Sequence, residues 1–89
     1  MRVLRGIVRK IERSGEKVVD ENGVVWEKCV FHIEITGFSK RVKERLPEHL
    51  RGKVVRVVRW CAFDWHYKLN VPATLTPRET ESILKEVNG

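Results

Sequence analysis

The chain opens with closely spaced apolar residues that fit two different periods. Val3, Leu4, Ile7, Val8 and Ile11 match helical spacing. However, Gly6 interrupts the pattern and most of these residues are β-branched, which favours a strand over residues 3–12. Two sets of turn residues follow, Ser14-Gly15 and Asp20-Glu21-Asn22-Gly23, and the second carries the Asn-Gly signal of a β-hairpin. Residues 17–19 are then expected to form a short strand between the two turns.

Residues 24–38 show the clearest alternation of apolar and polar positions. One face of this strand carries Cys29, Phe31, Ile33 and Ile35, and the other carries Lys28, His32, Glu34 and Thr36. Trp26 belongs to the second, more polar face. We therefore expect the first set to lie in the core and the second set to face water.

Residues 40–46 alternate again, with Val42 and Leu46 on one side and Arg41, Lys43 and Arg45 on the other. Pro47 and the stretch Leu50-Arg51-Gly52 predict a turn. A Val-rich strand over residues 53–60 follows it.

Residues 65–71 predict one more strand, joined to the previous one by residues 61–64. Its alternation places Trp65, Tyr67, Leu69 and Val71 on one face and His66, Lys68 and Asn70 on the other. Four apolar residues in register are typical of a core, so we expect Trp65 and Tyr67 to be buried.

The chain ends with the sequence signature of a helix start at Thr76. Thr76 can cap the helix, Pro77 suits its first position, and Glu79 completes a capping box. Ile83, Leu84 and Val87 form a narrow apolar stripe that predicts packing on the sheet.

Together these patterns predict a mainly β fold with about five strands and a C-terminal α-helix. The long first strand with Gly6, the turn near Pro47 and the Val-rich strand after it resemble OB-type barrels. The resemblance is one of fold and implies a small five-stranded Greek-key barrel over residues 2–71 with a helix over 77–88. An SH3-like barrel is the alternative. At 89 residues, the chain is expected to be a single domain, 1–89.

The net charge of +6 changes the picture most, because a basic domain attracts polyanions. Nucleic acid is the commonest such partner, and an anionic membrane surface is the second. No apolar run approaches the ~20 residues that span a bilayer, and the start lacks the features of a signal peptide. We therefore expect a cytoplasmic protein with no membrane partner.

The absence of Gln and the abundance of Arg, Lys, Glu and Val point to a thermophile.

Metal and catalytic chemistry find little support in the sequence. Cys29 and Cys61 are expected to be free thiols, although a disulfide between them stays open for a thermophilic protein. Cys29 and His32 lie three apart, so a strand points them to opposite faces and they do not suit one metal ion. Cys61, Asp64 and His66 are close in sequence but would be exposed at a hairpin tip. We expect no metal, no cofactor and no enzymatic activity.

The segment 53–71 combines aromatic rings with cations, as surfaces that bind single-stranded nucleic acid do. Our leading hypothesis is a non-enzymatic domain that binds single-stranded DNA or RNA. The expected phosphate contacts are Arg41, Lys43, Arg45, Arg56, Arg59 and Lys68, and the expected stacking residues are Trp26, Trp60 and Phe63. A solvated strand face would also account for the cations. The alternative function is a small protein-interaction module, or a homodimeric subunit of a larger complex.

Overall fold

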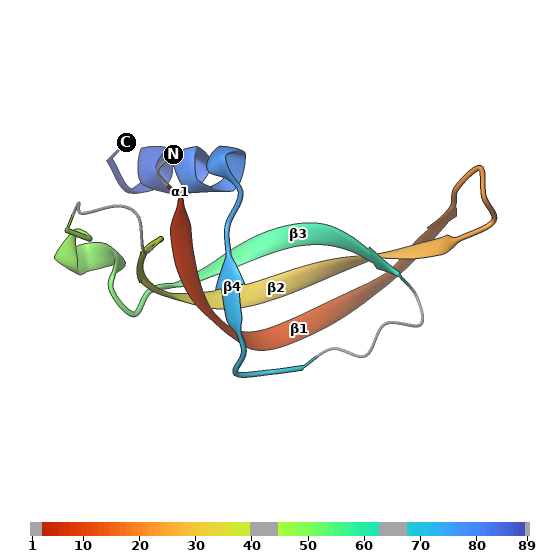
Figure 1. Ribbon diagram of the computed structural model, residues 1–89, viewed down its shortest axis with the longest axis horizontal. Helices are drawn as coiled ribbons and strands as arrows, with labels where there is room; N and C mark the ends of the chain where they lie inside the picture. Colours follow the sequence, from red (N-terminus) through yellow and green to blue (C-terminus); the bar gives the residue numbers. More distant parts are fainter. Residues whose placement is uncertain (1–2, 40–44, 63–67, 89) are drawn as a thin grey trace.

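The computed structural model describes residues 3–39, 45–62 and 68–88, which form a β-sheet followed by one helix (Figure 1). The elements are β1 (Leu4–Val19), β2 (Val25–Phe38), the 3₁₀ turn η1 (Glu48–Leu50), β3 (Val54–Ala62), β4 (Pro72–Thr74) and α1 (Pro77–Asn88). All the described strands pair antiparallel in the order β3-β2-β1-β4. The mainly β fold and the C-terminal helix are confirmed. The five-stranded barrel is not, because the described strands form an open four-stranded sheet.

The sheet has two faces that differ in their side chains. The inner face carries the odd-numbered residues of β2 and β3, among them Cys29, Phe31, Ile33, Ile35, Val55, Val57 and Cys61, all buried. The outer face carries the even-numbered residues of the same strands, which are partly or fully exposed: Trp26, Lys28, Val30, His32, Glu34, Val54, Arg56, Val58, Trp60 and Ala62. The alternation expected for residues 24–38 is therefore confirmed.

The core lies between the inner face and the segments that follow the sheet. Leu50 of η1, Leu75 before α1 and Ile83 of α1 are buried against it, and Leu84 packs beside them. This arrangement confirms the expected packing on the sheet for Ile83 and Leu84 of the apolar stripe. Cys29 and Cys61 are buried there, and no disulfide joins them.

β1 bends strongly close to its start, where it passes between β2 and β4 (Figure 1). Gly6 is buried at this point and pairs with Ile35 on one side and Ala73 on the other. The register of β1 against β2 shifts on either side of Gly6, between Arg5 and Gly6 and again between Val8 and Lys10. A Cβ atom at Gly6 would lie 2.2 Å from the Glu34 carbonyl oxygen, so only glycine allows this close approach of backbones.

The Ser14-Gly15 pair does not form the expected turn, but a bulge inside β1. Gly15 has φ +80°, and the register shifts between Arg13 and Lys17. The Ser14 hydroxyl donates to the Lys28 carbonyl oxygen at 2.7 Å and accepts from the Glu16 N–H at 3.0 Å, which satisfies backbone groups within the bulge. Residues 17–19 therefore continue β1 instead of forming a separate strand. The turn at Asp20–Gly23 is confirmed, since the Asp20 N–H donates to the Val24 carbonyl oxygen at 3.0 Å.

Residues 68–71 do not form the expected strand. Asn70 has φ +62°, which is incompatible with extended backbone, and Leu69 is 51% exposed instead of buried. Val71 does pack against the core. The expected burial of Trp65 and Tyr67 falls outside the described residues. In the strand expected over residues 40–46, Arg45 and Leu46 lie in coil, and residues 40–44 are outside the described ranges.

Candidate nucleic-acid interface

Cross-strand pairing arranges the outer face in rows that run from β3 across β2 to β1. Trp60 lies opposite Lys28, Val58 opposite Val30, and Arg56 opposite His32. The last row continues to Lys10 of β1, which pairs with His32. The face therefore combines an apolar and aromatic stripe on β3 with cations on β1, β2 and β3.

The two tryptophans of the outer face are neighbours. Trp60 pairs with Lys28 and Trp26 pairs with Ala62, so the two rings are diagonal neighbours on adjacent strands, roughly 7–8 Å apart between Cα atoms by normal sheet dimensions. Trp60 is 44% exposed and Trp26 is half-buried. Lys28, beside Trp60 on β2 and two residues from Trp26, places a cation next to both rings.

Asp20 in the β1–β2 turn fixes the edge of the Trp26 ring. The Trp26 indole N–H donates to Asp20 Oδ2 at 2.9 Å, while Asp20 Oδ1 accepts from the N–H groups of Asn22 and Val24. The hydrogen bond from Trp26 is the largest of the causes that hold the pKa of Asp20 below its usual value. A ring held in this way loses less freedom when a base stacks on it.

Most cations of the outer face have a carboxylate nearby. Lys28 Nζ lies 3.6 Å from Glu16, Lys10 Nζ lies 3.1 Å from Glu12, and Arg9 lies 3.4 Å from Glu34. The hydrogen bond from Lys10 is the main cause that holds the pKa of Glu12 below its usual value. These side chains are solvent-accessible, and exposed ion pairs of this kind add little to stability. A phosphate can therefore replace the carboxylate at small cost.

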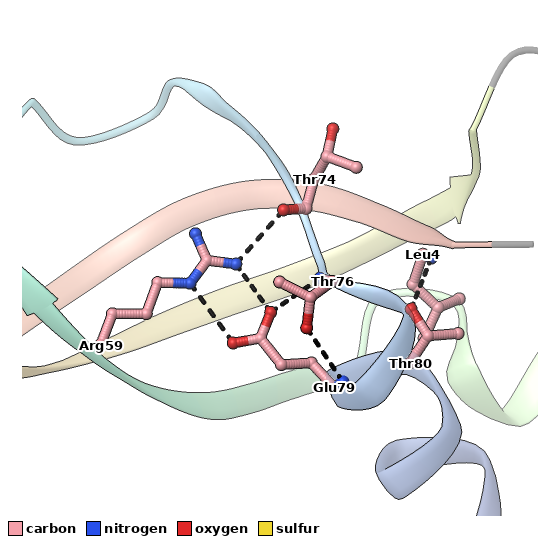
Figure 2. Close-up of polar contacts among 6 residues, drawn as sticks. All are labelled: Leu4, Arg59, Thr74, Thr76, Glu79 and Thr80. Atoms are coloured by element: carbon pink, nitrogen blue, oxygen red, sulfur yellow. Dashed lines mark hydrogen bonds and ion pairs between the residues drawn. The ribbon is translucent and has the colours of Figure 1, made fainter. Parts of the chain in front are cut away.

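Arg59, expected to bind phosphate, lies on the inner face (Figure 2). Its Nε and Nη2 donate to the two carboxylate oxygens of Glu79 at 3.3 and 2.8 Å, and Nη2 also donates to the Thr74 carbonyl oxygen at 3.2 Å. The guanidinium lies 5.9 Å from the centroid of the Phe31 ring. Arg59 thus joins β3 to the start of α1, away from Arg56 and Trp60.

The start of α1 has the capping box that the sequence predicts. The Thr76 N–H donates to Glu79 Oε1 at 2.8 Å, and the Glu79 N–H donates to the Thr76 hydroxyl at 3.1 Å. One residue further, the buried Thr80 hydroxyl accepts from the Leu4 N–H at 3.0 Å (Figure 2). These contacts fix the start of the helix to the edge strand β3 through Arg59 and to the inner strand β1 through Leu4.

Glu79→Gln is expected to lower the free energy of unfolding at neutral pH by about 1–2 kcal/mol, since it removes the charge that Arg59 and the cap use. Burial raises the pKa of Glu79, but the hydrogen bonds from Arg59 and Thr76 outweigh it and the net shift is downward. A lowered pKa stabilises the fold above the unfolded value, near 4.5, and this contribution is lost as the pH falls through the folded value.

Urea unfolding of the wild type and Glu79→Gln between pH 7 and pH 3 measures this effect. The difference between them should shrink below pH 4.5. Glu21→Gln, in the exposed β1–β2 turn, serves as the matched control and should follow the wild type. A difference that stays constant over the whole pH range would contradict the role of the Glu79 charge.

The structure places the other expected site residues as follows. Trp26, Trp60 and Arg56 share the outer face, as the hypothesis requires. Lys68 and Arg45 are exposed but lie outside the strands. Arg41, Lys43 and Phe63 fall outside the described residues. Lys28 and Lys10 are additional residues of the face; Lys28 could have been found from the sequence, since it has the same strand parity as Trp26.

The described part of the chain contains no cluster of three or more His, Cys, Asp and Glu side chains that could hold a metal ion. Cys29 is on the inner face and His32 on the outer face, in agreement with the strand period. Within the same residues, no helix has the length and apolar character that crossing a bilayer requires.

Comparison of the chain with protein-family models, with curated proteins and with solved structures finds no match.

Proposed function

We propose that the chain is a non-enzymatic domain that binds single-stranded nucleic acid on the outer face of its sheet. The observation that carries the proposal is the adjacent pair Trp26 and Trp60, accessible on an open sheet face beside Lys28 and Arg56. Aromatic rings on an uncovered sheet are a recurrent platform for unpaired bases. The net charge of +6 supports a polyanionic ligand.

In this proposal two successive bases stack on Trp26 and Trp60, and Lys28 between them neutralises the linking phosphate. Arg56 and Lys10 lie in one cross-strand row, two rows away from the row of Trp60 and Lys28, and bind further phosphates. Arg45 and Lys68 remain candidates for the flanking backbone, together with Arg41, Lys43 and Phe63. Arg59 is left out of the interface, because Glu79 and Thr74 occupy its guanidinium.

A single strand suits this face better than a duplex does. In a duplex the faces of the bases stack on one another, so a ring on a sheet cannot reach them without unstacking. In a single strand each base has a free face, and stacking does not depend on its sequence. The proposal therefore predicts weak sequence preference.

The proposal extends to the fold and the compartment. We propose an OB-like barrel as the fold, because the strong bend of β1 at Gly6 curls the sheet as such a barrel requires. We also propose the cytoplasm as the compartment, where buried cysteines such as Cys29 and Cys61 stay reduced.

Lys28→Gln and Glu16→Gln are expected to change the affinity for single-stranded oligonucleotides in opposite directions. Lys28→Gln removes one phosphate contact and should weaken binding about fivefold at 0.1 M salt. Glu16→Gln removes the carboxylate 3.6 Å from Lys28 and should strengthen binding. Fluorescence titration of a labelled oligonucleotide measures both. If both variants bind like the wild type, Lys28 is not a phosphate contact and the proposed face is wrong.

A further inference from the structure

β3 is the terminal strand of the sheet, with β2 on one side and no described strand on the other. The Ile35 N–H donates to the Lys53 carbonyl oxygen at 2.9 Å, which sets the hydrogen-bonding parity of the β2–β3 ladder. Odd-numbered residues of β3 therefore bond to β2. The even-numbered residues direct their backbone N–H and C=O groups away from the sheet: Val54, Arg56, Val58, Trp60 and Ala62.

The same residues carry apolar side chains that are exposed at this edge. Val54, Val58 and Trp60 are 49%, 52% and 44% exposed, respectively. Arg56 interrupts this apolar series with a charge. Long apolar edge strands invite pairing with another chain, and proteins usually protect them with charges or cover them. One arginine among these residues leaves the edge of β3 suited to pairing.

We propose that β3 pairs antiparallel with β3 of a second copy of this chain, with the two-fold axis at Val58. This register pairs Val58 with Val58, Arg56 with Trp60, and Val54 with Ala62 across the interface. It overlaps all nine residues of β3 and places the guanidinium of Arg56 next to an indole ring, which attracts it. The two sheets then join into one continuous sheet, and their outer faces become contiguous.

Other registers are less favourable for the same side chains. Moving the axis to Arg56 sets two arginines directly opposite each other, which is destabilising. Moving it to Trp60 shortens the overlap and leaves Val54 unpaired. Moving it to Val57 pairs Arg56 with Val58 and shortens the overlap to residues 54–60. The register centred on Val58 therefore overlaps the most residues of β3 without an arginine pair.

The side chain of Val58 at this edge is accessible, with 52% of its surface exposed. A hollow of about 260 Å³ lies between β3 and α1, lined by Val57 and Val58 on one side and by Ser82 and Ile83 on the other. The interface requires no nucleic acid, so the inference stands apart from the proposed function.

Sedimentation equilibrium of the full chain without nucleic acid tests the inference. We expect a mass twice the 10.5 kDa of one chain. Val58→Lys sets like charges opposite each other at the axis and should weaken self-association by at least about tenfold. Val19→Lys, at the exposed hairpin tip, makes the same chemical change away from β3 and should leave the dimer intact. A monomeric wild type, or a Val58→Lys variant that associates as the wild type does, would overturn the proposal.

Mixing Val58→Lys with Val58→Glu tests the register and shows that both variants fold. Each variant alone should be monomeric, and the mixture should form a heterodimer because opposite charges then meet at the axis. A mixture that stays monomeric while both variants unfold cooperatively would overturn the register. Association that occurs only in the presence of an oligonucleotide would overturn the inference and leave the proposed function standing.

Discussion

Gly6→Ala is expected to lower the free energy of unfolding by about 3 kcal/mol, at the upper end of what overpacking of a close-packed site costs. The new methyl group would lie 2.2 Å from the Glu34 carbonyl oxygen and 2.7 Å from Ile33 Cγ2. The carbonyl belongs to the backbone of β2, so relief requires movement of a strand and not of a flexible side chain. Gly6 also pairs with Ala73 of β4, and this strand would move with it.

Gly37→Ala is the matched control, because Gly37 lies on β2 close to the same bend, opposite Arg5. Its nearest neighbour would be Arg5 Nε at 4.0 Å, so a methyl group fits there. Thermal unfolding should show a midpoint about 12–24 °C lower for Gly6→Ala and a midpoint close to that of the wild type for Gly37→Ala. Equal midpoints for the two variants would show that the bend of β1 does not depend on glycine.

Trp60→Ala is expected to weaken binding of single-stranded oligonucleotides about tenfold to a hundredfold. Stacking of one base on a ring contributes roughly 1–3 kcal/mol, and Trp60 is the more exposed ring of the pair. Trp60→Phe keeps an aromatic face and should lose much less. Because Trp60 is 44% exposed on an edge strand, neither change should unfold the protein.

Binding of duplex DNA of the same length is the comparison for Trp60→Ala, because the Trp60 ring cannot stack on paired bases. The loss on duplex should be small. Equal losses on single strand and duplex would argue against stacking by Trp60. The mass of the variant should be measured in the same buffer, because Trp60 also lies opposite Arg56 in the proposed dimer.

Local features of the fold could be predicted from the sequence because their causes are local. The alternation over residues 24–38, the Asn-Gly turn and the capping box at Thr76 each depend on neighbours a few residues away. The Ser14-Gly15 bulge could not be told from a turn, because both use Gly at positive φ. The bulge forms because the Ser14 hydroxyl donates to the carbonyl oxygen of Lys28 on the partner strand β2, a residue distant in the sequence.

The residues of the candidate site were predicted less well because a face is a property of the assembled sheet. Arg56 and Arg59 are three apart on one strand, so the period that separates Cys29 from His32 separates them too. The strand period could have placed Arg56 and Arg59 on opposite faces of the sheet. The ion pair of Arg59 with Glu79 could not be predicted in this way, because Glu79 lies 20 residues away in the sequence. Leu69 matched a core pattern, yet the left-handed Asn70 ends any strand there and leaves Leu69 exposed.

The most direct test of the account is a salt-series titration of single-stranded DNA, RNA and duplex of equal length with the wild-type protein. We predict tighter binding to the single strands. The logarithm of their affinity should fall linearly with the logarithm of salt concentration, with a slope of about −2 for three phosphate contacts. No binding in dilute buffer, or an affinity that does not change with salt, would contradict the account.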